Sequence, residues 1–451
     1  MGDQGKMKLQ KLYKKLTMAN LLNWFAMRLF HVASRFCAGL VGKAVKLDPT
    51  RVIFQKNLLS LNKVSGGRAL PKSRKRTFPF YSFAEGCKLL DQKINYFDQN
   101  QTISLSLPKV INEDFKVSSE YKCEAKLPDT YLAELDNAII FGGTDLVIVQ
   151  DTVLYDEVKR GEEYIYGIKS PVVDKIDFQS VTIKLPKKIT KTIDCGIHFA
   201  KDHSRNYFHW IVECLPRLSL IKNLDKKIPL LVDEDLPPQF YEALQLLNEE
   251  GRELIKLKFG ETYKVKKLYY PPQLSILHDN YGVPIYHQDA IYSPKAINYI
   301  RDTVLKSLNI AHNKNNRKIY VSRKNSDYRQ LLNSTEIENI LVKYGFEILC
   351  PEYLSFAAQV EVFSQAQIII GQSGAGMANF MFAPKNCKVI MMAGDDPNTN
   401  LHGFHMLAEL TGVSLKFLFG NCAPIARKFS LHADFYIDVG LLLEQLNGME
   451  E

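Results

Sequence analysis

Long apolar runs are scarce in this sequence of 451 residues. The best candidate for a membrane span, 17–45, is interrupted by Arg28, Arg35 and Lys43. Its longest uncharged run, Thr17–Met27, is far shorter than the ~20 residues that a spanning helix needs. A signal peptide is not expected either, because the apolar core is interrupted and no clean small-residue cleavage site follows it. The sequence therefore predicts neither a membrane span nor a signal peptide.

Cysteine is sparse, and its spacing excludes two kinds of site. The eight cysteines are at least 19 residues apart, so the sequence contains no C-x-x-C pair. Neither a zinc site of the usual spacing nor a compact disulfide framework is indicated. Scattered cysteines are typical of small buried side chains in a reducing compartment. We therefore expect a cytoplasmic protein with no metal site.

Acidic residues are nearly absent from the first 76 residues. This segment holds 17 Lys and Arg against only Asp3 and Asp48, whereas the remaining 375 residues hold 41 basic and 47 acidic side chains. The sequence thus predicts a mildly acidic body with a strongly basic N-terminal arm. No recognised nucleic-acid module accompanies the basic residues, so nucleic acid is not an expected partner.

The arm has the periodicity of an amphipathic helix. Its two faces are apolar (Leu22, Ala26, Leu29, Ala33, Phe36, Leu40) and basic (Arg28, His31, Arg35, Lys46). A basic amphipathic helix that includes Trp24 is typical of a segment lying in the headgroup region of an anionic membrane. We therefore predict that 1–76 is a membrane-surface arm and linker, which holds a cytoplasmic protein peripherally at an anionic membrane. A helix packed on the body, with a solvated basic face, is the alternative.

The rest of the chain changes character along its length. From about 77 to 190 it reads as short strands, and from 318 onward strands alternate with helices. Such alternation predicts βαβ units and a parallel, doubly wound sheet. One of these helices opens with the capping-box pair Thr335 and Glu338. The predicted parts are an N-terminal domain at 77–290, a Rossmann-like domain at 291–425 and a C-terminal helix within 426–451.

A glycine-rich loop, Gly371–Gly376, follows the predicted strand 368–370 and includes Ser373, Gly374 and Ala375. In an open parallel sheet, ligands bind at the carboxyl ends of the strands. Glycines there let backbone N–H groups approach an anion, although many such loops are only tight turns. The spacing fits neither a dinucleotide fingerprint nor a P-loop.

Two arginines are expected at the same edge of the sheet. Arg323 directly follows the strand predicted at 318–322, and Arg329 lies six residues further along. The guanidinium fork matches phosphate oxygens in a bidentate manner. We therefore predict an anion site made by these arginines and the glycine loop, with a pair of unliganded surface arginines as the alternative.

A third cluster lies near the middle of the chain. His209 and Glu213 are four residues apart and share a helix face, and Arg217 follows after the kink expected at Pro216. A histidine beside a carboxylate can act as a general base with its orienting partner. A salt-bridged structural histidine is the ordinary alternative.

Together the three clusters resemble glycosyltransferase family 61. This family includes eukaryotic O-linked N-acetylglucosaminyl and xylosyl transferases and many bacterial capsule and polysaccharide enzymes. The resemblance covers about 195–415 and rests on the motifs "HW…LPRL", "SR…R…N" and "GAG..N..F.P". The family pattern falls on His209, Trp210, Pro216, Arg217, Ser322, Arg323, Arg329, Asn333, Gly374, Ala375, Gly376 and Asn379.

The resemblance implies an α/β protein of the GT-B kind, in which two Rossmann-like domains face a cleft. It implies inverting transfer of a sugar from a nucleotide-sugar donor to a hydroxyl of a glycan or lipid-linked acceptor, in polysaccharide biosynthesis. No cofactor or obligatory metal is expected. We assign catalysis to His209 and Glu213. Donor binding is assigned to Arg217, Ser322, Arg323, Arg329, Ser373, Gly374, Ala375, Gly376 and Asn379.

Two departures from the family pattern keep alternatives open. Ser373 stands where the family usually has histidine, and the strand at 389–392 lacks the usual carboxylate. A non-catalytic glycan-binding or scaffold protein on a decayed transferase fold is therefore one alternative. A metal-dependent GT-A transferase is another, because Asp233-Glu234-Asp235 has the D-x-D pattern that holds Mg²⁺ or Mn²⁺. The two prolines after this short motif favour a surface turn instead.

Overall fold

The computed structural model describes residues 73–112, 124–155, 160–161, 164–165, 170, 172–176, 180–186, 188–277, 290–311, 316–396, 399, 401–423 and 432–450. Residues 69–158 and 170–451 form one compact unit. Residues 1–68 and 159–169 form another, in which the structure describes the antiparallel strands β9 (Arg160–Gly161) and β10 (Tyr164–Ile165). The predicted amphipathic helix lies outside the described residues. Among the helices that are described, none has the length and apolarity to cross a bilayer.

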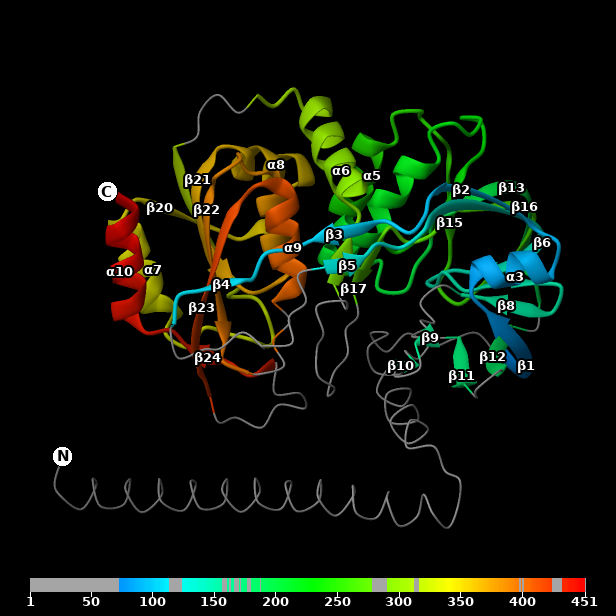
Figure 1. The fold of residues 1–451 in the computed structure, drawn as a ribbon, viewed down its shortest axis with the longest axis horizontal. Helices are drawn as coiled ribbons and strands as arrows, with labels where there is room; N and C mark the ends of the chain where they lie inside the picture. Colours follow the sequence, from blue (N-terminus) through cyan, green and yellow to red (C-terminus); the bar gives the residue numbers. More distant parts are fainter. Residues whose placement is uncertain are drawn as a thin grey trace, which may run out of the picture. The chain divides into compact units, whose positions relative to one another are not determined.

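An eleven-stranded sheet dominates the N-terminal half, meaning the described residues up to 277 (Figure 1). Its main path follows the order β11 (Val173–Ile176), β12 (Ser180–Pro186), β1 (Ser73–Tyr81), β8 (Thr152–Leu154), β7 (Val147–Val149), β6 (Thr130–Phe141), β16 (Thr262–Tyr270), β13 (Lys191–His198), β14 (Leu230–Asp233) and β15 (Leu254–Leu257). Strand β2 (Lys93–Asp98) pairs with β6.

This sheet is only partly the Rossmann-like sheet expected from the sequence. Its run β16-β13-β14-β15 is parallel, but β6 joins β16 antiparallel and β7 and β8 continue as an antiparallel meander. Strand β1 also begins inside the predicted linker. Its Lys75 and Arg76 form ion pairs with Asp174 (2.8 Å) and Asp151 (2.7 Å), so these two basic residues belong to the body.

The C-terminal half, from residue 290, contains a second sheet. Its order is β20 (Phe346–Leu349), β19 (Arg317–Val321), β21 (Ala366–Gln372), β22 (Lys388–Gly394), β23 (Ser414–Cys422) and β24 (Phe435–Tyr436). The first five strands are parallel, as predicted. The chain passes from β19 to β20 on one side of β19, whereas from β21 it passes to β22 and then β23 on the other side. The point where the strand order reverses therefore lies at the carboxyl ends of β19 and β21, where ligands bind in such sheets.

Helices cover both faces of this sheet because successive strand residues point to opposite sides (Figure 1). Ile368 and Ile370 of β21 pack with α7 (Ser334–Lys343) and α10 (Val439–Glu450). The intervening Ile369 belongs to the core that holds α8 (Phe356–Ser364) and α9 (His402–Thr411). The other core helices are α3 (Phe83–Leu89) and α5 (Pro238–Leu247) in the N-terminal half and α6 (Pro294–Ser307) in the C-terminal half.

One segment of the N-terminal half completes the C-terminal sheet. Strands β3 (Thr102–Ser104) and β5 (Glu124–Lys126) pair with each other, and between them in the chain strand β4 (Lys109–Val110) adds parallel to β23 at Lys416 and Phe417. The Ser106 backbone N–H donates to Glu409 on α9 (2.9 Å). This crossing is visible in Figure 1 as the cyan strand β4 beside β23. The domain boundaries at 76, 290 and 425 remain predictions. They did not anticipate that β4, from the N-terminal half, joins the C-terminal sheet.

The capping box predicted at Thr335 and Glu338 is wrong. Helix α7 begins at Ser334 without a side-chain cap. Glu338 instead accepts a hydrogen bond from Ser322 Oγ (3.1 Å) and pairs with Lys324, because the loop after β19 lies within reach of its carboxylate. The helix itself is present at Ser334–Lys343.

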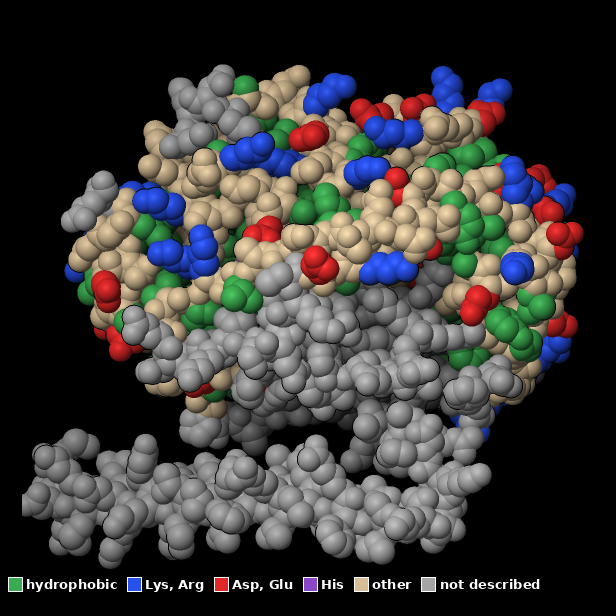
Figure 2. All heavy atoms as spheres, in the orientation of Figure 1, with side chains coloured by type: hydrophobic (Ala, Val, Ile, Leu, Met, Phe, Trp, Pro, Cys, Tyr) green, Lys and Arg blue, Asp and Glu red, His purple; other side chains and the backbone are tan. Residues whose placement is uncertain are grey.

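Half of the described cysteines are buried, as expected from the sequence, and the other half are partly exposed. Those cysteines that the structure describes are free thiols, and Cys87, Cys214 and Cys387 are buried. Figure 2 shows Lys and Arg side chains interspersed with Asp and Glu over the visible face of the described body. This mixed surface fits the charge balance of the body.

Candidate functional site

The turn that carries His209 is helical but changes pitch along its length. It begins as α4 (Tyr207–His209), continues as a π-helical turn at Trp210–Cys214 and tightens to a 3₁₀ helix at Leu215–Leu220. Asn206 caps its start by accepting the Phe208 backbone N–H (3.0 Å). π-Helical turns occur frequently at functional sites. Burial of Trp210, whose Nε1 donates to the Phe240 carbonyl, anchors the turn in the core.

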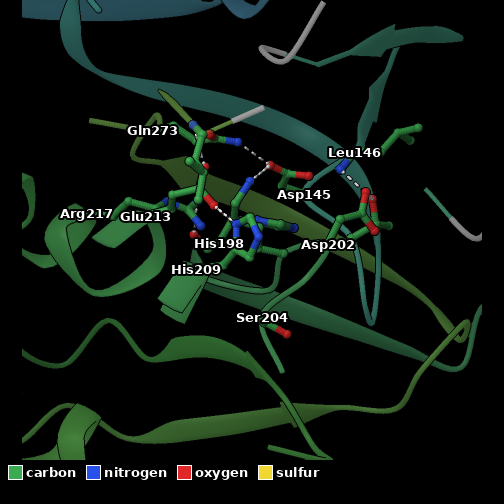
Figure 3. Close-up of polar contacts among 12 residues, drawn as sticks. Asp145, Leu146, His198, Asp202, Ser204, His209, Glu213, Arg217 and Gln273 are labelled. Atoms are coloured by element: carbon green, nitrogen blue, oxygen red, sulfur yellow. Dashed lines mark hydrogen bonds and ion pairs between the residues drawn. The ribbon is translucent and has the colours of Figure 1, made fainter. Parts of the chain in front are cut away.

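His209 and Glu213 form the predicted pair (Figure 3). His209 Nδ1 lies 2.5 Å from Glu213 Oε2, and the side chains are only 5% and 3% exposed. The other carboxylate oxygen, Oε1, accepts the Leu277 backbone N–H (3.1 Å). This arrangement favours a proton on Nδ1, since the carboxylate accepts there, and leaves Nε2 as the basic nitrogen. The pair therefore has the geometry of an oriented imidazole base.

Arg217 lies beside this pair, at the carboxyl edge of the N-terminal parallel strands. Its Nε donates to the Pro271 carbonyl (2.9 Å) and its Nη2 to the His198 carbonyl (2.8 Å), which follow or end β16 and β13. The side chain is fully buried, and its Nη1 has no hydrogen-bond partner among the described residues. Arg217 is thus committed to the N-terminal half, and the structure does not group it with the predicted donor residues.

His198 shares this buried environment but has the cation Arg217, rather than a carboxylate, as its charged neighbour. Burial lowers the pKa of His198 well below its usual range, and the positive charge of Arg217 adds to the decrease. The imidazole of His198 is therefore neutral near pH 7, whereas His209 has the carboxylate of Glu213 to stabilise an acquired proton. Of these two histidines, His209 is the one equipped for proton transfer.

A buried ion pair lies in the same region (Figure 3). Lys201 Nζ is 3.5 Å from Asp145 Oδ2, and the two side chains are 1% and 2% exposed. Gln273 Nε2 also donates to Asp145 Oδ2 (3.2 Å). Removing one member of a buried ion pair leaves the other charge uncompensated and strongly destabilises the fold. The sequence analysis missed this pair because its members come from segments far apart in the chain.

The D-x-D motif has a structural role. The Asp233 carboxylate accepts hydrogen bonds from the backbone N–H groups of Gly143 (2.6 Å) and Lys201 (3.2 Å) and from Ser204 Oγ (2.7 Å). Asp235 forms an ion pair with Arg205 (3.5 Å). Asp233 thus joins two loops, at Gly143 and at 201–204, to the end of β14. In the part of the chain that the structure describes, no group of three or more His, Cys, Asp or Glu side chains could hold a metal ion.

Arg323 and the glycine loop meet as predicted. Arg323 Nη1 donates to the Ser373 carbonyl (3.0 Å), and Nη2 donates to Ser326 Oγ (2.7 Å). A Cβ atom added to Gly374 would lie 1.5 Å from Arg323 Nη1, so glycine is required for this close approach. Ala375 and Gly376 then open a 3₁₀ helix, Ala375–Phe382.

Arg323 and Arg329 form a concentrated positive charge. Burial lowers the pKa of Arg323 to about 10, and the charge of Arg329 adds to the decrease. Each guanidinium has a buried Nε without a hydrogen-bond partner among the described residues. The guanidinium carbon Cζ lies 5.9 Å from the ring centroid of Tyr328 in Arg323 and 5.3 Å from it in Arg329. The Tyr328 ring stacks on that of His432, with 4.6 Å between the ring centroids. Among the described residues neither guanidinium forms a salt bridge, although the carboxylate of Glu352 attracts Arg323 from a greater distance. Two close cations with so little compensation favour an anionic ligand.

Ser322 and Asn379 were predicted to bind the donor, but their contacts indicate other roles. Ser322 is 1% exposed and donates to Glu338, which anchors the loop that carries Arg323. Asn379 is 0% exposed, and its Oδ1 accepts from Tyr207 Oη (2.5 Å). Buried side chains with partners of this kind position their neighbours, and sequence spacing does not distinguish them from ligand contacts.

Several side chains of the site were missed by the sequence analysis. Tyr328 and His432 flank the arginines, Lys201 and Asp145 lie near His209, and Tyr207 reaches Asn379. An aromatic residue directly before Arg329 was a usable signal for Tyr328, since arginine often stacks on aromatic rings. The other contacts depend on long-range packing.

Comparison with protein families identifies a match over part of the chain. No curated protein matches the chain. The model of the family described as Glycosyltransferase 61 matches residues 207–390. This range contains the His209–Glu213 pair, both arginines and the glycine loop, in the order expected from the sequence. This match over residues 207–390 supports a domain of the glycosyltransferase 61 family in that part of the chain.

Proposed function

We propose that this protein is an inverting glycosyltransferase that moves a sugar from a nucleotide-sugar donor to a hydroxyl of a glycan or lipid-linked acceptor. The observation that carries the proposal is the contact of Arg323 with Gly374, next to Arg329 and at the carboxyl ends of β19 and β21. A nucleotide diphosphate supplies the negative charge that this site lacks. The family match makes a sugar nucleotide the expected form of that diphosphate.

In the proposed reaction, the N-terminal half supplies the base and the C-terminal half stabilises the leaving group. His209 Nε2 takes the proton of the acceptor hydroxyl while the acceptor oxygen attacks the anomeric carbon of the donor sugar. The bond from that carbon to the diphosphate breaks, and Arg323 and Arg329 stabilise the departing negative charge. Glu213 stabilises the imidazolium that forms. Attack from the face opposite the leaving group inverts the anomeric centre. The proposed architecture is a GT-B arrangement with the reaction between the two halves.

A panel of nucleotide sugars tests this proposal directly. We expect the purified full-length protein to release free nucleotide from one or a few members of the panel, and faster when a hydroxyl acceptor is present. Product release should persist in EDTA, because cationic side chains rather than a metal stabilise the diphosphate. A protein that binds glycans but releases no nucleotide from any donor would be a scaffold. Loss of activity in EDTA would favour the metal-dependent alternative.

We also propose that the basic arm holds the protein at an anionic membrane, in polysaccharide biosynthesis such as capsule formation. Deleting 1–46 should shift the protein from anionic liposomes to the supernatant without changing its melting temperature. Each Lys or Arg near an anionic surface contributes about 1 kcal/mol, and salt screens this attraction. High salt should therefore release the full-length protein as well. Equal sedimentation with neutral and anionic liposomes would contradict the proposal.

A further inference from the structure

Two side chains connect the His209 turn with the segment after the glycine loop. Tyr207, two residues before His209, directs its Oη to Asn379 Oδ1 at 2.5 Å. Asn379 lies in the 3₁₀ helix Ala375–Phe382, five residues after Gly374. The hydrogen bond therefore joins the two halves between the parts of each that bear the proposed chemistry.

The link continues into the C-terminal half. Asn379 Nδ2 donates to Gln359 Oε1 (2.7 Å) on α8, and Gln359 Nε2 donates to the Leu354 carbonyl (3.2 Å). Asn379 and Gln359 are 0% and 4% exposed. Burial raises the pKa of Tyr207 far above its usual value, so its hydroxyl stays protonated and remains the donor to Asn379. The three side chains thus form a hydrogen-bond relay with defined directions.

We propose that Tyr207 and Asn379 are positioning residues that fix the His209–Glu213 pair relative to the donor loop. This inference rests on the proposed function. Apolar contacts such as Phe208 against Phe404 hold the same surfaces together, but apolar attraction is not directional. The Tyr207–Asn379 hydrogen bond is directional, and displacement would leave the fully buried Asn379 oxygen without this donor. Misplacement of reacting groups by about 1 Å can reduce a rate ~100-fold.

The test uses Tyr207→Phe and Asn379→Ala, with Tyr241→Phe as the matched control. Tyr241 is also partly buried and donates its hydroxyl across 2.5 Å, but to the Asp233 carbonyl within the N-terminal half. We expect Tyr207→Phe and Asn379→Ala each to lower kcat at least tenfold while the dissociation constant for the donor's nucleoside diphosphate stays within about threefold. The double variant should be no slower than the slower single variant, since both changes break one link. Tyr241→Phe should retain the wild-type kcat.

Three results would overturn the inference or its central assignment. Wild-type kcat in folded Tyr207→Phe would remove the positioning role. Loss of nucleotide affinity in Asn379→Ala alone would return Asn379 to the donor site. A drop in kcat that follows only the melting temperature of the variants, and matches that of Tyr241→Phe, would reduce the relay to ordinary packing.

Hydrogen exchange separates this inference from the proposed function. In the free protein, Tyr207→Phe should speed amide exchange in 375–382 as well as in 207–214, whereas Tyr241→Phe should leave 375–382 unchanged. If the wild-type protein transfers no sugar, the proposed function fails, and this exchange pattern still decides whether the relay couples the two segments. Unchanged exchange in 375–382 of Tyr207→Phe would overturn the coupling in either case.

Discussion

His209→Ala should lower the rate of sugar transfer by roughly 10²–10⁴-fold, the usual contribution of a general base. Nucleotide binding should persist, because the imidazole belongs to the His209–Glu213 pair in the N-terminal half, while the arginine site lies at the C-terminal sheet. Turnover, nucleotide affinity and melting temperature should be measured on the same preparation. Transfer at the wild-type rate by folded His209→Ala protein would end the assignment of the base.

Glu213→Gln distinguishes the roles within the pair. If Glu213 orients the imidazole and stabilises its proton, its loss should reduce kcat less than the loss of His209. The reverse order would make Glu213 the base. His405→Asn is a suitable control, since His405 is also buried and uses one ring nitrogen, Nε2, beside the Ser106 carbonyl (2.8 Å). Equal losses of activity in the control and in His209→Ala, in proportion to folded protein, would support a structural role for the pair.

Arg323→Ala should weaken nucleotide diphosphate binding tenfold to a hundredfold, because a charge-assisted hydrogen bond contributes roughly 1.5–3 kcal/mol. Arg329→Ala should act in the same direction. Thermal stability should change little, since removing one guanidinium also relieves its repulsion with the other. Arg323→Lys should recover only part of the affinity, because an ammonium lacks the planar fork.

Arg317 provides the matched control for these arginines. It lies at the opposite end of β19 from Arg323 and pairs with Glu347 (Nε to Oε1, 2.9 Å), so Arg317→Ala should leave nucleotide affinity unchanged. Gly374→Ala should reproduce the loss seen in Arg323→Ala, since its Cβ occupies the space of the guanidinium. Unchanged affinity of Arg323→Ala and Arg329→Ala for every nucleotide tested would place the donor site elsewhere.

The C-terminal sheet could be predicted because its signals are local. Each strand from β19 to β23 is followed within a few residues by a helix or turn, and the strand ends place Arg323 and Gly374 at one edge. The N-terminal sheet could not be predicted in the same way. Its long strand β6 pairs with β16, more than 100 residues later, and β1 pairs with β12 at similar separation. No local pattern specifies such partners.

Among the site residues, too, local contacts could be predicted from the sequence and long-range contacts could not. The helical spacing of His209 and Glu213 was sufficient to predict their contact, which the structure confirms. Arg217 and Asn379 carry the family pattern equally well, but burial commits them to the Pro271 carbonyl and to Tyr207. Whether a polar side chain faces a ligand or a neighbouring loop depends on the packing of distant elements, which one sequence does not reveal.

The pairing of β4 with the C-terminal sheet has a consequence for preparing fragments of this protein. A fragment made from residues 291–451 would contain every helix of the C-terminal sheet but would lack Lys109–Val110, its partner along Lys416–Phe417. The edge of β23 would then present unpaired backbone groups, which readily recruit strands from other molecules. Such a fragment would also lose the Ser106 contact on α9. The C-terminal half is thus not separable from the 102–112 segment, and insertions or fusions within that segment should be poorly tolerated.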